Sequence, residues 1–301
     1  MRYLWILPVV LVCAGLLVLG FGCLLAVYST RIKRQTLAEA RAWQEEHYDL
    51  SWYDPLQKED YLLRCRDGYQ LHVQHLCNPN PSNRAVIISH GLTDNRYGAL
   101  KYAKPYLDMG FDVIIYDLRG HGENKKTWCS YSLRESRDLN LLIRDTRDRF
   151  PDLKVLGLHG ESLGAATSVA VLRYSPKVDF VVSDCAFSEV KSILTAGLKS
   201  MHLPEKCILL SGFCTRLLYG VSYDEMRPID RLKKATQPIL FIHGAADELI
   251  PPSHAEDMHA AVEDHSELHL VDGAPHALSV LTAPEDYRRW LRGFLRDYDL
   301  L

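Results

Sequence analysis

One serine in the chain stands between two glycines directly after an apolar run. In the stretch LGLHGESLGAATSVA, residues 156–170, Ser162 is the centre of a G-x-S-x-G pattern with Gly160 and Gly164. The residues before the pattern are typical of a buried strand, and the small apolar residues after it have helical spacing. So abrupt a turn presents the serine hydroxyl at the start of a helix, where free N–H groups favour negative charge. The stretch predicts a nucleophilic serine; the alternative is a glycine-rich turn without chemistry.

A serine nucleophile needs a base to take its proton and an acid to orient that base. In chains with this turn, the acid and then the histidine follow the serine in the sequence. His276, in the stretch VDGAPHAL between a predicted strand and the last predicted helix, is the candidate base. Asp247 follows an apolar run in FIHGAADELIP and is the candidate acid, with Asp184 at the end of VVSD as the alternative.

Two backbone N–H groups are needed to hold the negatively charged oxygen that forms when the serine attacks a carbonyl. Leu163, the residue after the nucleophile, supplies the first. We expect the second from Leu92 in ISHGLTDN, because Gly91 lets the backbone come close. Another stretch, YDLRGHGEN, combines arginine, histidine and glycines. We interpret it as a hydrogen-bonded turn in which His121 is structural.

Short apolar runs alternate with helical patterns along the part of the chain that carries these residues. Asp67 and Gly68, between two alternating segments, predict a hairpin ahead of them. Strands that alternate with helices predict a mostly parallel sheet covered on both faces, with ligands at the carboxyl ends of the strands. The predicted strands lie within residues 84–91, 111–117, 154–160, 178–184, 237–244 and 267–273, and the predicted helices within 97–109, 133–150, 253–262 and from 284 onward.

Two other segments have helical character. Residues 187–230 contain no clear strand pattern, and their large apolar residues recur at loosely helical spacing. We interpret them as a small helical cap over the site. Residues 31–58 include TLAEARAWQEEHY, which predicts a linker helix.

Five stretches in this order, SHGLTDN, DLRGHGEN, LHGESLGAA, FIHGAADELIP and GAPHA, resemble the α/β-hydrolase superfamily. Within it they resemble the bacterial esterases and serine-aminopeptidase-like (prolyl-oligopeptidase-related) hydrolases with an N-terminal hydrophobic anchor. The resemblance covers about residues 60–298 and implies an α/β-hydrolase fold. It also implies a nucleophile, an acid, a base and two oxyanion donors at Ser162, Asp247, His276, Leu92 and Leu163.

The N-terminal segment has the length and composition of a membrane span. Residues 4–28 carry no charge, and as a helix they cover about 37 Å, enough for a bilayer core of about 30 Å. A cleaved secretory signal is the alternative, although its apolar region is usually about 7–15 residues long. We expect a single-pass anchor in the cell membrane. Arg2 precedes the span and Arg31, Lys33 and Arg34 follow it, which leaves the side of the catalytic domain open.

The composition limits the other partners. The formal net charge of −3 over 301 residues offers no basic excess for nucleic acid. The sequence has no C-x-x-C, H-E-x-x-H, Walker or G-x-G-x-x-G motif, so we expect neither a metal nor a cofactor.

These patterns predict an anchor in residues 1–30, a linker helix in 31–58 and an α/β-hydrolase domain in 59–301, with the cap at about 187–230. The predicted activity is that of a serine hydrolase, which cleaves an ester, thioester or amide of a small acyl substrate through an acyl-enzyme. A serine peptidase on short peptides is one alternative. A non-catalytic binding module on the same fold is another.

Overall fold

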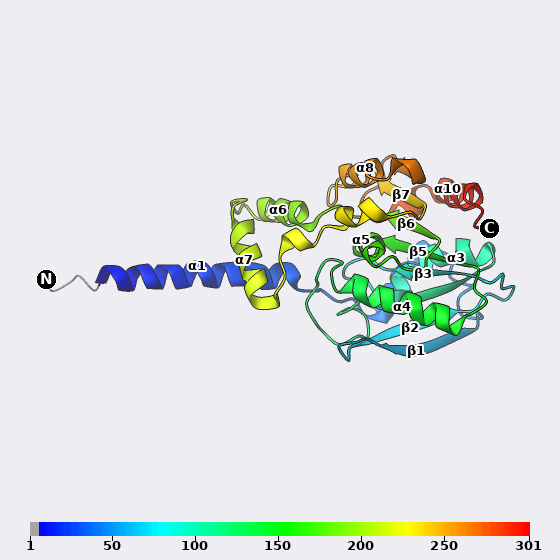
Figure 1. The fold of residues 1–301 in the computed structure, drawn as a ribbon, viewed down its shortest axis with the longest axis horizontal. Helices are drawn as coiled ribbons and strands as arrows, with labels where there is room; N and C mark the ends of the chain where they lie inside the picture. The colour runs from blue at the N-terminus through cyan, green and yellow to red at the C-terminus, as the bar shows by residue number, and fades with distance from the viewer. Residues whose placement is uncertain (1–5) are drawn as a thin grey trace. The chain divides into compact units, whose positions relative to one another are not determined.

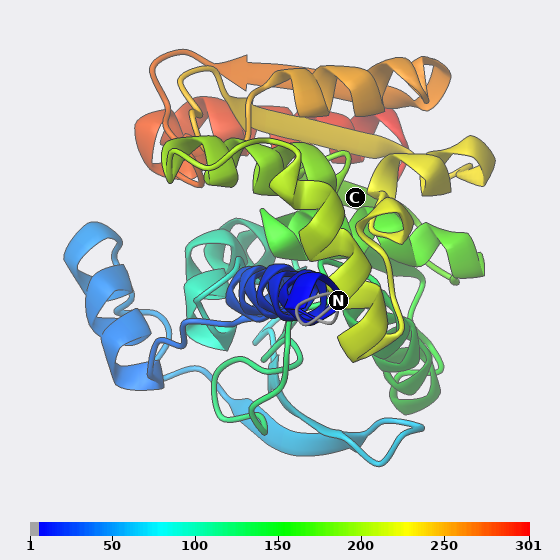
Figure 2. The same ribbon diagram turned by 90° about the vertical axis from the view of Figure 1, so that its left-hand side faces the viewer.

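An eight-stranded sheet forms the centre of the hydrolase part of the chain. The computed structural model describes residues 6–301, so Leu4 and Trp5 of the predicted span lie outside the described residues. The strand order is β1-β2-β4-β3-β5-β6-β7-β8, with β1 and β8 at opposite edges (Figures 1 and 2). The pairs β1–β2 and β2–β4 are antiparallel and all others are parallel, which confirms the mostly parallel sheet. The strands are Lys58–Arg64, Gln70–Leu76, Arg84–Ser89, Phe111–Tyr116, Val155–Glu161, Phe180–Asp184, Ile239–Gly244 and Ser266–Val271.

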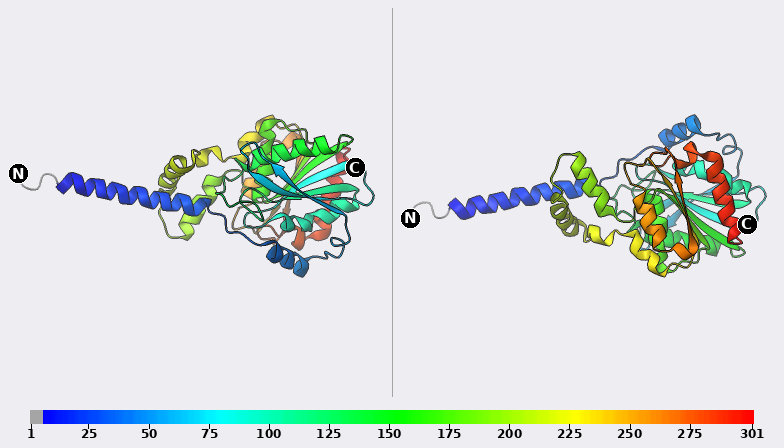
Figure 3. Two further views of the ribbon diagram at one scale, coloured as in Figure 1. Left: turned by 90° about the horizontal axis from the view of Figure 1, so that it is seen from below. Right: turned by 90° about the horizontal axis from the view of Figure 1, so that it is seen from above.

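Helices cover both faces of the sheet, as the alternation predicts (Figure 3). On one face, apolar residues of β3, β4, β6 and β7 form a core with aromatic side chains of α3 and α10, including Tyr106 and Phe294. Helices α4 and α5 pack against the other face. Because the central strands are buried on both sides, they are continuous apolar runs rather than alternating ones. The helices are Leu37–His47 (α2), Leu100–Asp108 (α3), Glu135–Arg149 (α4), Leu163–Ala170 (α5), Ser253–Ala260 (α8), Ser279–Thr282 (α9) and Pro284–Asp297 (α10).

Local signals explain the hairpin and the linker helix. The hairpin between β1 and β2 turns at Gly68, whose φ of 80° suits glycine. Helix α2 begins with a capping box, because the side chain of Thr36 accepts from the N–H of Glu39 and the Glu39 carboxylate accepts from the N–H of Thr36. The structure contains both elements where the sequence predicts them.

The chain forms two compact units. One contains the chain up to Arg31 together with Glu189–Met226, and the other contains Ile32–Ser188 together with Arg227–Leu301. The first unit comprises α1 (Ile6–Thr30), α6 (Val190–Ser200), α7 (Cys207–Tyr219) and the short 3-10 helix Tyr223–Glu225. Most of the predicted insertion is therefore helical, and its residues 189–226 belong to the same compact unit as the N-terminal helix. Within the described residues, α1 is the one helix long and apolar enough to cross a membrane.

Candidate active site

The turn from β5 into α5 places Ser162 in a strained backbone conformation. Its φ is 52° and its ψ is −112°, and its N–H donates to the carbonyl of Asp184 over 2.9 Å. The flanking glycines permit the turn. A Cβ on Gly160 would lie 2.4 Å from the amide nitrogen of Ala165, and a Cβ on Gly164 would lie 2.1 Å from the carbonyl oxygen of Ser89. The G-x-S-x-G spacing is thus explained by two close backbone contacts around one serine.

Gly164→Ala is expected to destabilise the protein by about 2 kcal/mol or more, because overpacking against fixed backbone forces the strand and helix apart. Gly293→Ala is the matched control, since Gly293 lies inside α10 and a Cβ there would meet no atom within 4 Å. That change is expected to stabilise the helix by about 0.5–1 kcal/mol. The measurement is thermal unfolding of both variants and of the native chain in detergent. Equal effects of the two substitutions would contradict the packing argument.

The predicted base lies between the predicted nucleophile and the predicted acid. His276 Nε2 is 2.9 Å from Ser162 Oγ, and His276 Nδ1 is 2.6 Å from Asp247 Oδ2. A carboxylate can only accept, so Nδ1–H donates to Asp247 and Nε2 is left to accept the serine proton. Gly244 allows the loop after β8 to approach the end of β7, because a Cβ on Gly244 would lie 2.2 Å from the carbonyl oxygen of Ala274. The loops that follow β7 and β8 therefore meet, and they carry the acid and the base together.

The buried carboxylate of Asp247 accepts hydrogen bonds from several donors. The N–H groups of Leu249 and Ile250 donate to its Oδ1 over 3.0 and 2.8 Å, and His243 Nε2 lies 3.2 Å from its Oδ2. Burial by itself raises the pKa of the Asp247 carboxyl, but the hydrogen bonds from His243 and His276 outweigh burial and hold the pKa below its ordinary value. The carboxylate is therefore ionised at neutral pH and oriented from both sides.

Asp184, the alternative acid, has different partners. Its Oδ2 accepts from the hydroxyls of Tyr102 and Tyr287, each over 3.1 Å. Burial raises the pKa of the Asp184 carboxyl to about 6, and the nearby Glu161 carboxylate adds to the increase. The structure brings Asp247, and not Asp184, to His276.

A buried ionic cluster directly behind the serine was missed by sequence reasoning. Glu161 pairs with the ammonium group of Lys101 and accepts from Tyr102 over 2.7 Å. Both side chains of the ion pair are almost fully buried. Burial opposes the charge on Lys101, but Glu161 overcomes it and raises the pKa of the ammonium group. The one available signal was a charged residue within the small-residue pattern G-E-S-L-G.

The two expected oxyanion donors lie at the ends of elements that meet at the serine. Leu163 is the first residue of α5, so its N–H has no acceptor within the helix. The loop that carries Leu92 is close by, since a Cβ on Gly91 would lie 3.7 Å from the Ser162 Cβ. His90 fixes this loop by two hydrogen bonds. Its Nδ1–H donates to the carbonyl of Gly91 over 2.7 Å, and its Nε2 accepts from the N–H of Leu118 over 2.9 Å.

The stretch YDLRGHGEN is a hydrogen-bonded turn, as predicted. The carboxylate of Asp117 accepts from the N–H of Arg96 over 2.8 Å and from that of Glu123 over 2.9 Å. His121 is buried, and burial lowers the pKa of its imidazole to about 3. A buried, neutral histidine that lies outside the Ser162–His276 contact is consistent with a structural role.

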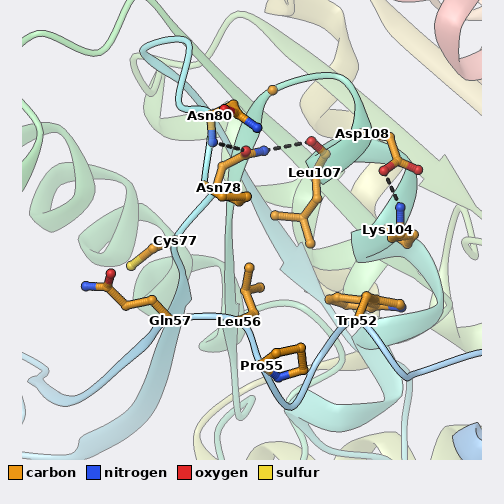
Figure 4. A pocket seen from close by; sticks show the side chains of 12 residues that line it. Trp52, Pro55, Leu56, Gln57, Cys77, Asn78, Asn80, Lys104, Leu107 and Asp108 are labelled. Atoms are coloured by element: carbon orange, nitrogen blue, oxygen red, sulfur yellow. Dashed lines mark hydrogen bonds and ion pairs between the residues drawn. The ribbon is translucent and has the colours of Figure 1, made fainter.

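A cavity of about 710 Å³ lies elsewhere, near the start of β4 (Figure 4). Asn78, Lys104 and Asp108 are among its lining residues, and Asn78 Nδ2 donates to the carbonyl of Leu107 over 2.7 Å. Ser162 follows the carboxyl end of β5, which is parallel to β3 and hence to β4. The cavity is therefore at the amino ends of the parallel strands, whereas Ser162 is at their carboxyl ends. Near the cavity, Glu59, His75 and Cys77 have their ligand atoms within 4.8 Å of one another.

Known proteins are similar to this chain in sequence or in fold. A family model described as the alpha/beta hydrolase fold matches residues 84–204. The uncharacterized protein YqkD of Bacillus subtilis (strain 168) is 30% identical over 247 residues, 81% of each chain. The uncharacterized membrane protein YNL320W of Saccharomyces cerevisiae is 24% identical over 202 residues, 67% of this chain and 66% of the yeast protein. The esterase Pf2001 of Pyrococcus furiosus superposes with a TM-score of 0.70 at 19% identity, over 89% of this chain and 98% of that one. The chain belongs to the α/β-hydrolase family.

Proposed function

We propose that the protein is a membrane-anchored serine hydrolase that cleaves a carboxylic ester, thioester or amide through an acyl-enzyme. The observation that carries the proposal is the hydrogen-bonded chain from Ser162 through His276 to Asp247, at 2.9 and 2.6 Å. Hydrogen bonds of this length connect a nucleophile, a base and an orienting acid in the order that the chemistry needs.

In the proposed reaction, Ser162 Oγ attacks the acyl carbonyl while His276 Nε2 takes the hydroxyl proton. Asp247 stabilises the imidazolium that forms. The N–H groups of Leu163 and Leu92 donate to the negatively charged oxygen. His276 then gives its proton to the leaving group, and the carbonyl re-forms as the acyl-enzyme. A water molecule then attacks the acyl carbonyl while His276 Nε2 takes its proton. The bond from the acyl carbon to Ser162 Oγ breaks, and His276 returns the proton to Oγ, which releases the carboxylic acid and restores the serine.

Two observations favour catalysis over a binding role. Ser162 combines a φ of 52° with a ψ of −112°, outside the left-handed helical region, and strain of this kind is concentrated at functional positions. A binding module also needs neither the Asp247–His276 contact nor the donors that keep Asp247 ionised. Because the esterase Pf2001 shares the fold, esters are the first substrates to test.

The proposed activity is tested on the full chain in detergent with a fluorophosphonate probe, followed by p-nitrophenyl esters of graded acyl length and by short peptide p-nitroanilides. We expect covalent labelling at Ser162, which tryptic mass spectrometry locates, and faster cleavage of esters than of anilides. Faster cleavage of the anilides would identify a peptidase. If the probe does not react and no substrate is cleaved, the chain is a binding module.

The proposed anchor has its own expected result. The full chain is expected to stay in the membrane pellet after an alkaline carbonate wash, because about 20 apolar residues are too costly to remove from lipid. Leu11→Arg combined with Leu17→Arg places two charges in the span, each at a cost of about 2.5–3.5 kcal/mol, and is expected to release protein. The yeast relative is also called a membrane protein. Release of the native chain would reject the anchor, and the mass of the mature N-terminus would then identify a cleaved signal.

A further inference from the structure

We propose that helix α7 lies in the membrane boundary beside α1 and that its exposed apolar stripe, Leu209, Phe213 and Leu217, contacts lipid acyl chains. The inference rests on the proposed anchor role of α1. It assigns a function to the insertion, which neither the family fold nor the catalytic residues require.

Helix α7 packs directly on the apolar part of α1. A Cβ on Gly22 would lie 2.5 Å from Leu210 Cγ and 2.8 Å from Cys214 Sγ, so α7 fits against the helix where α1 has no side chain. The hydroxyl of Tyr223 joins the two segments, at 2.7 Å from Ser29 Oγ and 2.9 Å from Ser211 Oγ. Figures 1 and 2 show α7 running across α1 rather than along it.

The position of Gly22 fixes the depth of α7. The predicted span begins at Leu4, so 18 of its residues precede Gly22, and 18 residues of helix cover about 27 Å. The hydrocarbon core is about 30 Å thick, which is more than those residues span. If α1 crosses the bilayer, Gly22 therefore lies at or just inside the hydrocarbon boundary, and the side chains packed on it lie there too. A helix that crosses α1 at this depth lies roughly in the plane of the membrane.

The surface of α7 suits that position. Leu209, Phe213 and Leu217 follow one another at four-residue intervals and are 63%, 61% and 61% exposed. Residues at this spacing share one face of a helix. Lys206 precedes the helix and Arg216 lies in its last turn, both exposed, where long cationic side chains can reach lipid head groups.

Lipid is the occupant that the contacts favour. The medium that surrounds α1 at Gly22 also surrounds the outward side of a helix packed on it. In water, three large apolar side chains on one short helix would remain exposed at a cost in free energy. In the boundary region of a bilayer, the same side chains are buried without any protein partner.

The full chain in vesicles of phosphatidylcholine and phosphatidylglycerol tests the proposal with an apolar diazirine photoprobe dissolved in the bilayer. After illumination, mass spectrometry locates the labelled residues. Leu62, on β1 in the other unit, is the matched control because it is also apolar and 50% exposed. We expect label on α1 and on the stripe of α7, and none on Leu62. Label on α1 alone would overturn the proposal and leave the anchor intact. Label on neither helix would reject both the anchor and this proposal. Equal label on Leu62 and on α7 would show that the probe labels any exposed apolar side chain, and would also overturn the proposal.

Phe213→Asp gives an independent measurement. A charge at the hydrocarbon boundary is expected to lower the population of the inserted state by up to about 100-fold, so label at Leu209 and Leu217 falls steeply. Leu62→Asp is expected to change nothing. Fluorophosphonate labelling of Ser162 in each variant reports whether the hydrolase unit is still folded. Unchanged label on α7 after Phe213→Asp would contradict insertion, and Leu217→Asp repeats the test at a second position.

Discussion

Ser162→Ala is expected to lower turnover of p-nitrophenyl esters by about 10⁶-fold, the loss typical of removing a triad nucleophile. The reason is that no other hydroxyl occupies the place of Ser162 Oγ, 2.9 Å from His276 Nε2. Fluorophosphonate labelling is expected to disappear as well. The substitution removes a single oxygen atom, so the fold is expected to persist. The measurement is turnover of the purified variant, together with its thermal unfolding.

Ser168→Ala is the matched control for this loss. Ser168 lies on the same helix, α5, and its hydroxyl donates to the carbonyl of Gly164 over 2.9 Å, away from His276. Its removal is expected to cost about 1 kcal/mol of stability and to leave turnover near that of the native chain. If Ser162→Ala retained native turnover, the catalytic role of the turn would be rejected outright. If Ser168→Ala lost as much activity as Ser162→Ala, the loss would reflect the folding of α5 rather than its chemistry.

The sequence predicted those features whose physical cause lies in neighbouring residues of the chain. Buried parallel strands must be apolar on both faces, and so the strands from β3 to β7 were recognisable as short apolar runs. The turn at Ser162 needs glycine at Gly160 and Gly164 because backbone atoms lie within 2.4 Å of any Cβ there. The order of serine, acid and histidine along the chain, together with the ends of the predicted strands, then left Asp247 and Asp184 as the candidate acids.

The sequence did not predict contacts between segments that are far apart in the chain. Lys101 carries no signal in the sequence that sets it apart from other helical lysines, yet it pairs with Glu161 inside the protein. Helix α7 lies in the segment predicted as a cap over the site, and nothing in the sequence indicated its packing on α1, about 190 residues earlier in the chain. Neither pairing leaves a periodic pattern, because each depends on which surfaces meet after folding.

Asp247→Asn is expected to lower turnover by about 10⁴-fold through a change of tautomer at His276. The amide oxygen of asparagine can still accept from the N–H groups of Leu249 and Ile250, as Oδ1 now does over 3.0 and 2.8 Å. The amide NH₂ then replaces Oδ2 opposite His276 Nδ1 and donates to it. Nδ1 must accept, so the proton moves to Nε2, and Nε2 can no longer take the proton of Ser162.

Asp184→Asn is the matched control, because it makes the same chemical change at the alternative acid. Asp184 faces Tyr102 and Tyr287 at 3.1 Å, and an asparagine oxygen can accept from both hydroxyls. We therefore expect turnover within about tenfold of the native chain, since no hydrogen bond to His276 is lost. Rates of ester cleavage and of fluorophosphonate labelling, with thermal unfolding of both variants, give the comparison. The opposite ranking, with Asp184→Asn the more damaging, would assign the orienting acid to the end of β6. Equal and small losses would mean that His276 needs no orienting carboxylate.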